Sequence, residues 1–231
     1  TWTDLQTLHL QENKIEAEGA RELSQNGNWS NLQLLGLQQN NLGAEGAAEL
    51  AKNESWKNLQ LLYLHYNSIG DKGAAGLSRN VSWTMLQTLL LNSNEIGPEG
   101  AAELGKSTSW VSLQTLDLSN NAIGCKGAIG LSANKSWVSL QHLNLSSTSI
   151  GAEGAAGLSK NVSWVNLRLL ELEKNKIGPE GAVALGKNTS WVNLETLDLR
   201  NCAIGPKGGG LGSNLTWTNL KTLDLAYNFI K

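Results

Sequence analysis

The sequence is poor in sulfur and in most bulky core residues. Its 231 residues include two Cys, one Met, one Phe, three Tyr, three His and three Pro. Two cysteines cannot supply the disulfide framework that holds many small secreted domains together. Since Phe, Tyr and Met are scarce, the core has to be built from Leu, Ile, Ala and Trp.

Long apolar runs are missing as well. No stretch approaches the roughly 18 apolar residues of a membrane-spanning helix, so we expect no membrane contact. No secretory leader is visible, although the chain opens in mid-repeat at Thr1, so a leader removed upstream stays open. The length suits one elongated domain spanning residues 1–231.

Tryptophan, by contrast, recurs along the whole chain at a fixed interval. Seven of the eight steps between successive Trp are 27 residues and the last is 26. A fixed period of about 20 to 50 residues is typical of a solenoid, in which each repeat stacks on the next. The nine residues are Trp2, Trp29, Trp56, Trp83, Trp110, Trp137, Trp164, Trp191 and Trp217.

Other residues keep the same period. Counted from each Trp as position 0, Leu occupies positions 3, 6 and 8 in all nine copies, and Ile or Leu occupies position 13. Asn occupies position 11 in seven copies, with Thr148 and Cys202 as substitutes. The apolar residues at positions 6 and 8 alternate with a variable residue, which is the periodicity of a β-strand.

The second half of each repeat predicts a short helix. Segments such as EGAAEL (45–50) and EGAVAL (180–185) contain good helix formers. Pro98, Pro179 and Pro206 fall in the expected first turn, where the missing N–H is tolerated. We expect the helices to end at an Asn in the left-handed cap conformation. These are Asn26, Asn53, Asn80, Asn134, Asn161, Asn188 and Asn214.

The pattern LxxLxLxxNxI, followed by IGxEGAxxL, resembles the leucine-rich repeat, and within it the ribonuclease-inhibitor-like class that also occurs in NOD-like receptors. The resemblance covers all nine repeats. It implies a right-handed α/β horseshoe with a concave parallel sheet, convex helices and repeats of about 27 residues. The repeat is slightly shorter than usual for that class, and Trp stands where an aliphatic residue is more common.

The Trp residues are predicted to form a buried column. One strand and one short helix cannot bury a core alone, so a Trp in every copy is best used against its neighbours. The alternative is an exposed Trp stripe that binds a partner, but such a patch would favour aggregation.

The compartment is less clearly indicated. Cys125 and Cys202 lie three repeats apart, about 14 Å at the spacing of strands, which is beyond disulfide reach. A chain without disulfides suits the cytoplasm. Secretion stays an alternative, because N-x-S/T sequons occur at Asn28, at Asn144 and in the cap register from Asn53 to Asn214. We interpret the latter as helix caps multiplied by repeat copying.

Neither end of the array carries the polar cap typical of terminal repeats. The first repeat is as apolar as the others, and the chain stops at Lys231 directly after a strand. The sequence therefore predicts either a fragment of a longer protein or an array that associates end to end. Near this end the helical segment becomes GPKGGGLGSN (205–214), and its glycines predict the weakest layer.

Enzymatic motifs are weak. The segment GAAELGKS (100–107) matches a phosphate-binding loop, but the repeat places Lys106 at the end of a helix rather than at its start. His9, His65 and His142 lie too far apart to share a metal. His142 is expected near Asp117 and Ser119, a triad-like set on an open surface without an oxyanion hole. We therefore expect no enzyme, no cofactor and no metal.

Variation is concentrated on one surface. The buried framework hardly changes between copies, while the residues that point from the strands to the concave face vary from copy to copy. Relaxed constraint is one explanation, but the equally exposed helices changed less, which favours a recognition surface. The candidate partner-binding residues are His9, Glu12, Leu34, Leu61, Tyr63, His65, Tyr66, Leu90, Asn92, Asp117, His142, Asn144, Glu171, Glu173, Lys174, Asp198, Arg200, Asp224 and Tyr227.

The composition of this surface predicts its partner. Repeats 2–4 supply an apolar and aromatic patch of the kind that anchors a binding partner. The face also carries six acids against two bases, a net charge near −4, when the whole chain has −2. Such a face attracts a basic protein or peptide and repels nucleic acid. The sequence thus predicts a protein-binding scaffold, with a glycosylated receptor fragment or a nucleotide-binding or hydrolytic enzyme as alternatives.

Overall fold

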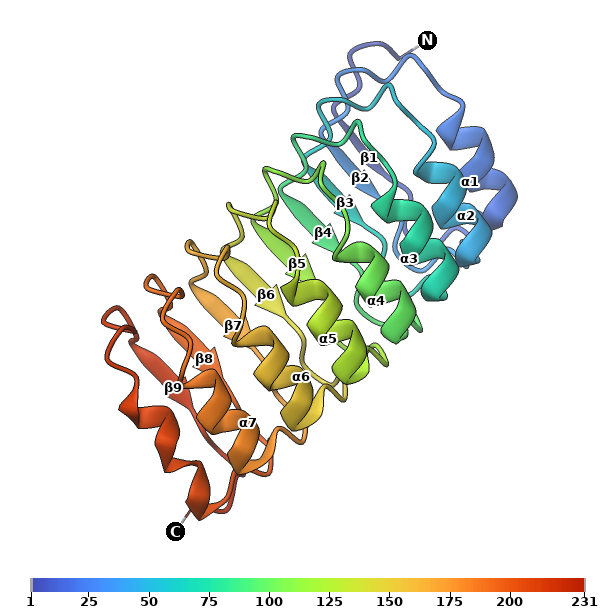
Figure 1. Cartoon of the computed structure of the whole chain (residues 1–231). Coiled ribbons are helices and arrows are strands. Elements are labelled where there is room, and N and C mark those ends of the chain that lie inside the picture. Colours follow the sequence, from blue (N-terminus) through green and yellow to red (C-terminus); the bar gives the residue numbers. More distant parts are fainter. Residues whose placement is uncertain (1, 231) are drawn as a thin grey trace.

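The nine repeats form one continuous solenoid in a computed structural model, which describes residues 2–230 (Figure 1). Nine parallel strands make a single sheet in chain order, and the helices cover one side of it. The strands are β1 Thr7–His9, β2 Leu34–Gly36, β3 Leu61–Tyr63, β4 Thr88–Leu90, β5 Thr115–Asp117, β6 His142–Asn144, β7 Leu169–Glu171, β8 Thr196–Asp198 and β9 Thr222–Asp224. The helices are α1 Glu16–Ser24, α2 Gly43–Leu50, α3 Gly70–Ser78, α4 Pro98–Leu104, α5 Gly124–Ser132, α6 Gly151–Leu158, α7 Gly178–Leu185 and the 3₁₀ helix η1 Pro206–Ser213. The predicted fold class is confirmed.

Each strand pairs with the next at equivalent positions. Leu35 lies opposite Leu62, and the shorter last repeat keeps this register, with Leu197 opposite Leu223. The position-6 leucines from Leu35 to Leu197 are fully buried, whereas their neighbours at positions 5 and 7 are mostly half-exposed. Equivalent side chains therefore form rows across the sheet, one strand spacing apart.

The tryptophan column is confirmed. Trp56, Trp83, Trp110, Trp137, Trp164 and Trp191 are completely buried, and Trp29 and Trp217 nearly so. The rings of Trp110 and Trp137 stack with centroids 6.3 Å apart and an interplanar angle of 11°. The buried indole Nε1 atoms have no hydrogen-bond partner among residues 2–230. The rings thus contribute through packing and stacking rather than through hydrogen bonds.

A row of buried asparagines at position 11 ties adjacent repeats together. Asn67 accepts hydrogen bonds at Oδ1 from the backbone N–H of Asn40 (2.9 Å) and Leu42 (3.3 Å) in the preceding repeat. Its Nδ2 donates to the carbonyls of Leu37 (2.8 Å) and Leu64 (2.9 Å). Each Asn therefore satisfies backbone groups in two repeats, which neither repeat can satisfy alone.

The prediction for the second asparagine row was wrong. The residues from Asn53 to Asn188 do not have positive φ, and the α-helices end in the right-handed conformation. Asn80 is buried, donates from Nδ2 to the carbonyls of Ala51 and Asn53, and accepts at Oδ1 from the N–H of Ser82 and Trp83. Turn carbonyls in the preceding repeat need a buried donor, and this need outweighs local capping.

The left-handed residues lie instead in the loop between strand and helix. In the third repeat Tyr66, Ser68 and Gly70 have φ values of 57°, 51° and 57°. Alternate residues with positive φ coil this loop tightly, so the helix begins close to the end of the strand. Glycine takes the last of the three places in most repeats, where it adopts this conformation without a steric penalty.

The helix starts follow the prediction in most repeats. Pro98 and Pro206 open α4 and η1, and Pro179 is the second residue of α7. The α4 start differs, because Asp71 of the preceding repeat accepts the N–H of Gly97 and Gly100, both at 2.7 Å. The glycine-rich segment 206–213 forms a 3₁₀ helix rather than an α-helix, consistent with its low helix propensity.

The two ends of the array are apolar in their described parts. Trp2 is 68% exposed, and Phe229 and Ile230 are 85% and 49% exposed. Thr1 and Lys231 lie outside the described residues. Within residues 2–230 no helix combines the length and apolar character that crossing a bilayer requires.

Truncating the central tryptophan should destabilise the solenoid. Trp110→Ala leaves a cavity in the column, and we expect a loss of about 3–5 kcal/mol in the free energy of unfolding. Trp110→Phe should cost less than about 2 kcal/mol, since the indole N–H that it removes has no partner. Urea unfolding of both variants measures the difference. Equal losses would show that the N–H makes a contribution absent from this packing account.

A single substitution should restore the interrupted second asparagine row. Ser107 takes the Asn position in the fourth repeat, is 1% exposed, and its Oγ has no partner among the described residues. Ser107→Asn should stabilise the fold by about 1 kcal/mol, because the amide reaches the turn groups that Ser cannot. Ser107→Ala is the control, since it removes the hydroxyl without adding an amide. Thermal unfolding in which Asn is no better than Ala would contradict the expectation.

Candidate partner-binding face

The variable side chains form a strip along the outer side of the sheet. We call this the sheet face; it comprises the residues at positions 5 and 7 of each strand and at positions 9 and 10 of the following loop. The three-residue strands supply about 10 Å of its width, to which the loop positions add, and nine strands make it about 38 Å long. The helices cover the other side of the sheet (Figure 1), so the strip is open to a partner.

Apolar and aromatic residues gather at repeats 2–4. The anchor patch consists of Leu34, Leu61, Tyr63, Tyr66 and Leu90. In register, Leu34 lies opposite Leu61 and Tyr63 opposite Leu90, so four of the five residues occupy neighbouring places on three strands. Those four are half-buried, while Tyr66 is 52% exposed in the adjoining loop. The patch therefore offers contiguous apolar area of the kind that anchors a partner.

His65 borders this patch in the neutral state. Burial lowers the pKa of its imidazole, and the negative charge of Asp117 opposes that shift only in part. Its ring meets Tyr66 edge to face at 5.8 Å, and its Nδ1 has no partner among residues 2–230. Asn92, a half-buried amide, lies in the loop after β4, the next strand. The histidine thus adds ring surface to the patch and no positive charge at neutral pH.

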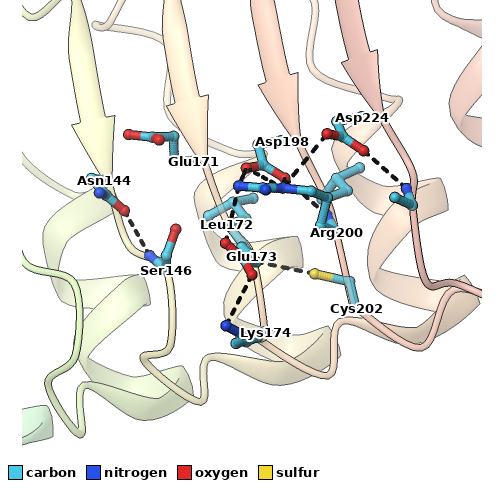
Figure 2. Close-up of polar contacts among 12 residues, drawn as sticks. Asn144, Ser146, Glu171, Leu172, Glu173, Lys174, Asp198, Arg200, Cys202 and Asp224 are labelled. Carbon is cyan, nitrogen blue, oxygen red and sulfur yellow. Dashed lines mark hydrogen bonds and ion pairs between the residues drawn. The ribbon is translucent and has the colours of Figure 1, made fainter.

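Repeats 7–9 carry a carboxylate cluster of Glu171, Glu173, Asp198 and Asp224, and all of these except Glu171 contact Arg200 (Figure 2). Arg200 donates to both carboxylate oxygens of Asp198, at 2.7–3.0 Å, and to Glu173 at 3.0 Å. It also lies 3.5 Å from Asp224. Hydrogen bonds and charge from Asp198, with smaller effects of Glu173 and Asp224, raise the pKa of Arg200 further above its ordinary value.

This pairing reduces the charge that the cluster presents. Its four acids and the bases Lys174 and Arg200 give a net charge of −2. Lys174 pairs with Glu173 at 3.0 Å, and Asp198 is only 6% exposed. The acids that stood out in the sequence are therefore largely satisfied within the protein, and Asp198 is covered.

Four position-7 residues also accept a hydrogen bond from a backbone N–H of the loop that follows their strand. Asp117 accepts the N–H of Ser119 (2.8 Å), and Asn144 accepts that of Ser146 (2.9 Å). Asp198 and Asp224 do the same for the N–H two residues on. Sequence analysis missed this local role, although Asp or Asn two residues before an unpaired N–H is its usual signal.

His142 lies on β6 beside β5, as expected, but its side chain contacts the strand on the other side. The imidazole Nε2 lies 2.5 Å from Glu171 on the next strand, and Asp117 is hydrogen-bonded to the Ser119 backbone instead. The triad-like set of His142, Asp117 and Ser119 is therefore not assembled. His9 and Glu12 lie at the exposed first repeat, and Tyr227 is 80% exposed at the last one.

Metal and phosphate binding find little support in the geometry. Within residues 2–230 no three His, Cys, Asp or Glu side chains are grouped as metal ligands. In the segment 100–107, the N–H of Gly100 is already donated to Asp71, and Lys106 follows the end of α4, where it pairs with Glu103 at 2.5 Å. This arrangement is the reverse of a phosphate-binding loop, as the sequence predicted.

The two thiols should differ in reactivity. Both cysteines are free; Cys202 is buried, and its Sγ donates to the carbonyl of Leu172 at 3.0 Å (Figure 2). Burial raises the pKa of the Cys202 thiol to about 11, so it stays protonated at neutral pH. Iodoacetamide should label the native protein at half-exposed Cys125 alone, and both residues after denaturation. Mass spectrometry of the adducts checks this, and rapid labelling of native Cys202 would contradict it.

Comparison with solved structures supports the fold alone. The chain aligns with mouse RP105 in complex with MD-1 (TM-score 0.57, 21% identity, 96% of this chain and 35% of that chain). It also aligns with TLR13 in a complex with ssRNA13 (0.53, 23%, 97% and 33%). A third match is the plant peptide hormone receptor RGFR1 in complex with RGF2 (0.51, 20%, 96% and 32%). The chain thus spans about a third of each of these proteins.

The family itself is shown by sequence. No curated protein matches the chain. The model of a family described as leucine-rich repeat matches residues 3–24, 57–78, 84–105, 111–132, 138–159, 165–186 and 192–210, well over half of the chain. These segments include every strand except β2 and β9. The chain therefore belongs to the leucine-rich repeat family.

Proposed function

We propose that the protein is a recognition scaffold that binds a protein or peptide on its sheet face. The observation that carries this proposal is the contrast between the two sets of side chains. The framework rows are buried and nearly identical from repeat to repeat, whereas the sheet face is mostly accessible and varies between repeats, above all at positions 7, 9 and 10. A rigid scaffold with one variable surface is the arrangement that repeat proteins use for binding.

The partner has an apolar anchor and basic groups. The anchor patch supplies the apolar contact, and the acids of the face outnumber its bases by six to two. This net charge favours cationic partners and opposes nucleic acid phosphates. TLR13 is described in a complex with ssRNA, yet its likeness to this chain concerns the fold.

We place the chain in the ribonuclease-inhibitor-like class, because seven of its nine repeats alternate a strand with an α-helix.

We also propose the cytoplasm as its location. Five sequon residues, Asn53, Asn80, Asn134, Asn161 and Asn188, are buried at 3–4% exposure and donate from Nδ2 to two carbonyls each. A glycan on these amides would disrupt the turns. The intact mass of protein from its natural source separates this proposal from a glycosylated receptor fragment.

Two further proposals have simple tests. Catalysis and nucleotide binding are not part of the proposed function, and an increase in melting temperature on adding ATP or GTP would contradict the absence of nucleotide binding.

End-to-end association is proposed through the apolar ends, where Trp2 and Phe229 are exposed. If chains associate end to end, analytical ultracentrifugation at increasing protein concentration should show a mass above the 24.8 kDa of one chain. A mass that stays at 24.8 kDa would contradict the association.

Truncation at the anchor patch should weaken binding of the partner. Tyr63→Ala removes a half-buried ring beside Leu90, and we expect a loss of at least about 2 kcal/mol in binding free energy. Glu171→Lys should instead slow association of a basic partner and reduce its dependence on salt. Binding kinetics at two salt concentrations, with the intact chain as bait, measure both effects.

The matched controls lie on the helical side. Reversing Glu99 on α4, or Lys160 after α6, changes charge by the same amount without touching the sheet face. These variants should bind normally. If they abolish binding while Tyr63→Ala and Glu171→Lys are silent, the partner docks on the helices and the proposed site is wrong.

A further inference from the structure

The acids of the sheet face are not equivalent. Glu173, Asp198 and Asp224 all contact Arg200, and Glu171 contacts His142. Asp117 has no cationic partner among residues 2–230. Glu12, the other sheet-face acid without a side-chain partner among the described residues, lies in the loop after β1, outside the anchor patch. A carboxylate that keeps its charge uncompensated attracts a cation more strongly than one already paired.

Asp117 is also held in place. Its Oδ1 accepts the Ser119 N–H at 2.8 Å, so the carboxylate is oriented by its own loop. Its Oδ2 takes part in no hydrogen bond with the described residues. The side chain is half-buried, which limits its freedom before a ligand arrives. One oxygen of Asp117 is thus fixed and the other is available.

The anchor patch adjoins this carboxylate in one row. Tyr63 lies opposite Leu90, and Leu90 lies opposite Asp117 in the next pair. The row therefore runs from an aromatic ring over an aliphatic residue to a carboxylate, across about 10 Å. Neutral His65 lies close enough to Asp117 to feel its charge, and its ring contacts Tyr66. An apolar stretch that ends in a fixed negative charge is complementary to a long side chain with a cationic head.

We propose that Tyr63, Leu90 and Asp117 bind one arginine side chain of the partner. Its aliphatic stem lies over Leu90, and its guanidinium donates to the free oxygen of Asp117. This assignment rests on the proposed function, and it moves the site of charge recognition from the carboxylate cluster to β5. Arginine fits better than lysine, because its guanidinium is more weakly hydrated than an ammonium and presents its N–H donors in a rigid fork toward a carboxylate, while the start of its stem lies beside Tyr63.

The smallest probe of this site is N-acetyl-L-arginine amide. It should be titrated into the isotope-labelled whole chain and followed by NMR of the Leu90 methyl groups and the Asp117 and Ser119 amides. We expect saturable shifts at these residues, with a dissociation constant of about a millimolar, as befits so small a ligand. The citrulline analogue keeps the shape without the charge, and should bind at least about five-fold more weakly.

A matched pair of variants isolates Asp117. Asp117→Asn removes one charge but keeps the acceptor for Ser119, since Asn144 holds Ser146 in the same way in the next repeat. Asp224→Asn makes the identical change within the carboxylate cluster. We expect Asp117→Asn to weaken the arginine probe at least about five-fold, and Asp224→Asn less than about two-fold. Unchanged melting temperatures show that both variants fold.

Three results would overturn the inference: no saturable shifts, equal effects of the two variants, or shifts located on β7–β9. The failure of the proposed function is a different outcome. If the partner requires Tyr63 while the arginine probe leaves Leu90 and Asp117 unchanged, the sheet face stands as the binding site and the arginine assignment is wrong. If the partner binds the helical side, the proposed function fails whether or not the probe binds.

Discussion

The buried asparagine at position 11 is the constraint on which the rest of the structure depends. Its amide completes hydrogen bonds for backbone groups of its own repeat and of the one before, as Asn67 does for Leu64 and Leu37. An unsatisfied buried backbone group costs about 1–3 kcal/mol, so a repeat that slips loses several such bonds at once. A residue that replaces Asn at position 11 makes only some of these hydrogen bonds. Cys202 donates to the carbonyl of Leu172, whereas an Asn would also donate to a carbonyl of its own repeat. The fixed step between repeats follows from this row.

That fixed step determines the electrostatics of the sheet face. Because equivalent residues lie one strand apart, Glu171, Asp198 and Asp224 are forced into adjacent places in the same row. Like charges at this spacing repel. Arg200, from the neighbouring loop position, contacts Asp198 and Asp224 and so offsets the repulsion. The same geometry leaves Asp117 between Leu90 and Asn144, without a neighbouring acid or a base.

The sequence predicted what depends on the period and little of what depends on side-chain direction. Strands, helices, the tryptophan column and the position-11 row all follow from residues that recur every 27 places. The repeat period does not reveal whether a side chain contacts the preceding or the following strand. His142 was expected beside Asp117 on one side and contacts Glu171 on the other. Likewise the sequons resembled helix caps, and only the positions of the carbonyls in the preceding repeat show why Asn80 is buried.

Framework and sheet face are nearly separate, and position 7 is where they meet. Among the described residues, the side chains of Tyr63 and Leu90 make no hydrogen bond to the loop, so this part of the row can change without loss to the fold. At four position-7 residues the side-chain Oδ1 accepts a loop N–H, and the second polar atom of the side chain is not used in that hydrogen bond; these residues are Asp117, Asn144, Asp198 and Asp224. Replacing such a residue by the other member of the Asp/Asn pair alters the charge of the face and keeps the loop. The surface can therefore gain or lose charge one unit at a time at fixed geometry, which is how a repeat scaffold changes its partner without changing its fold.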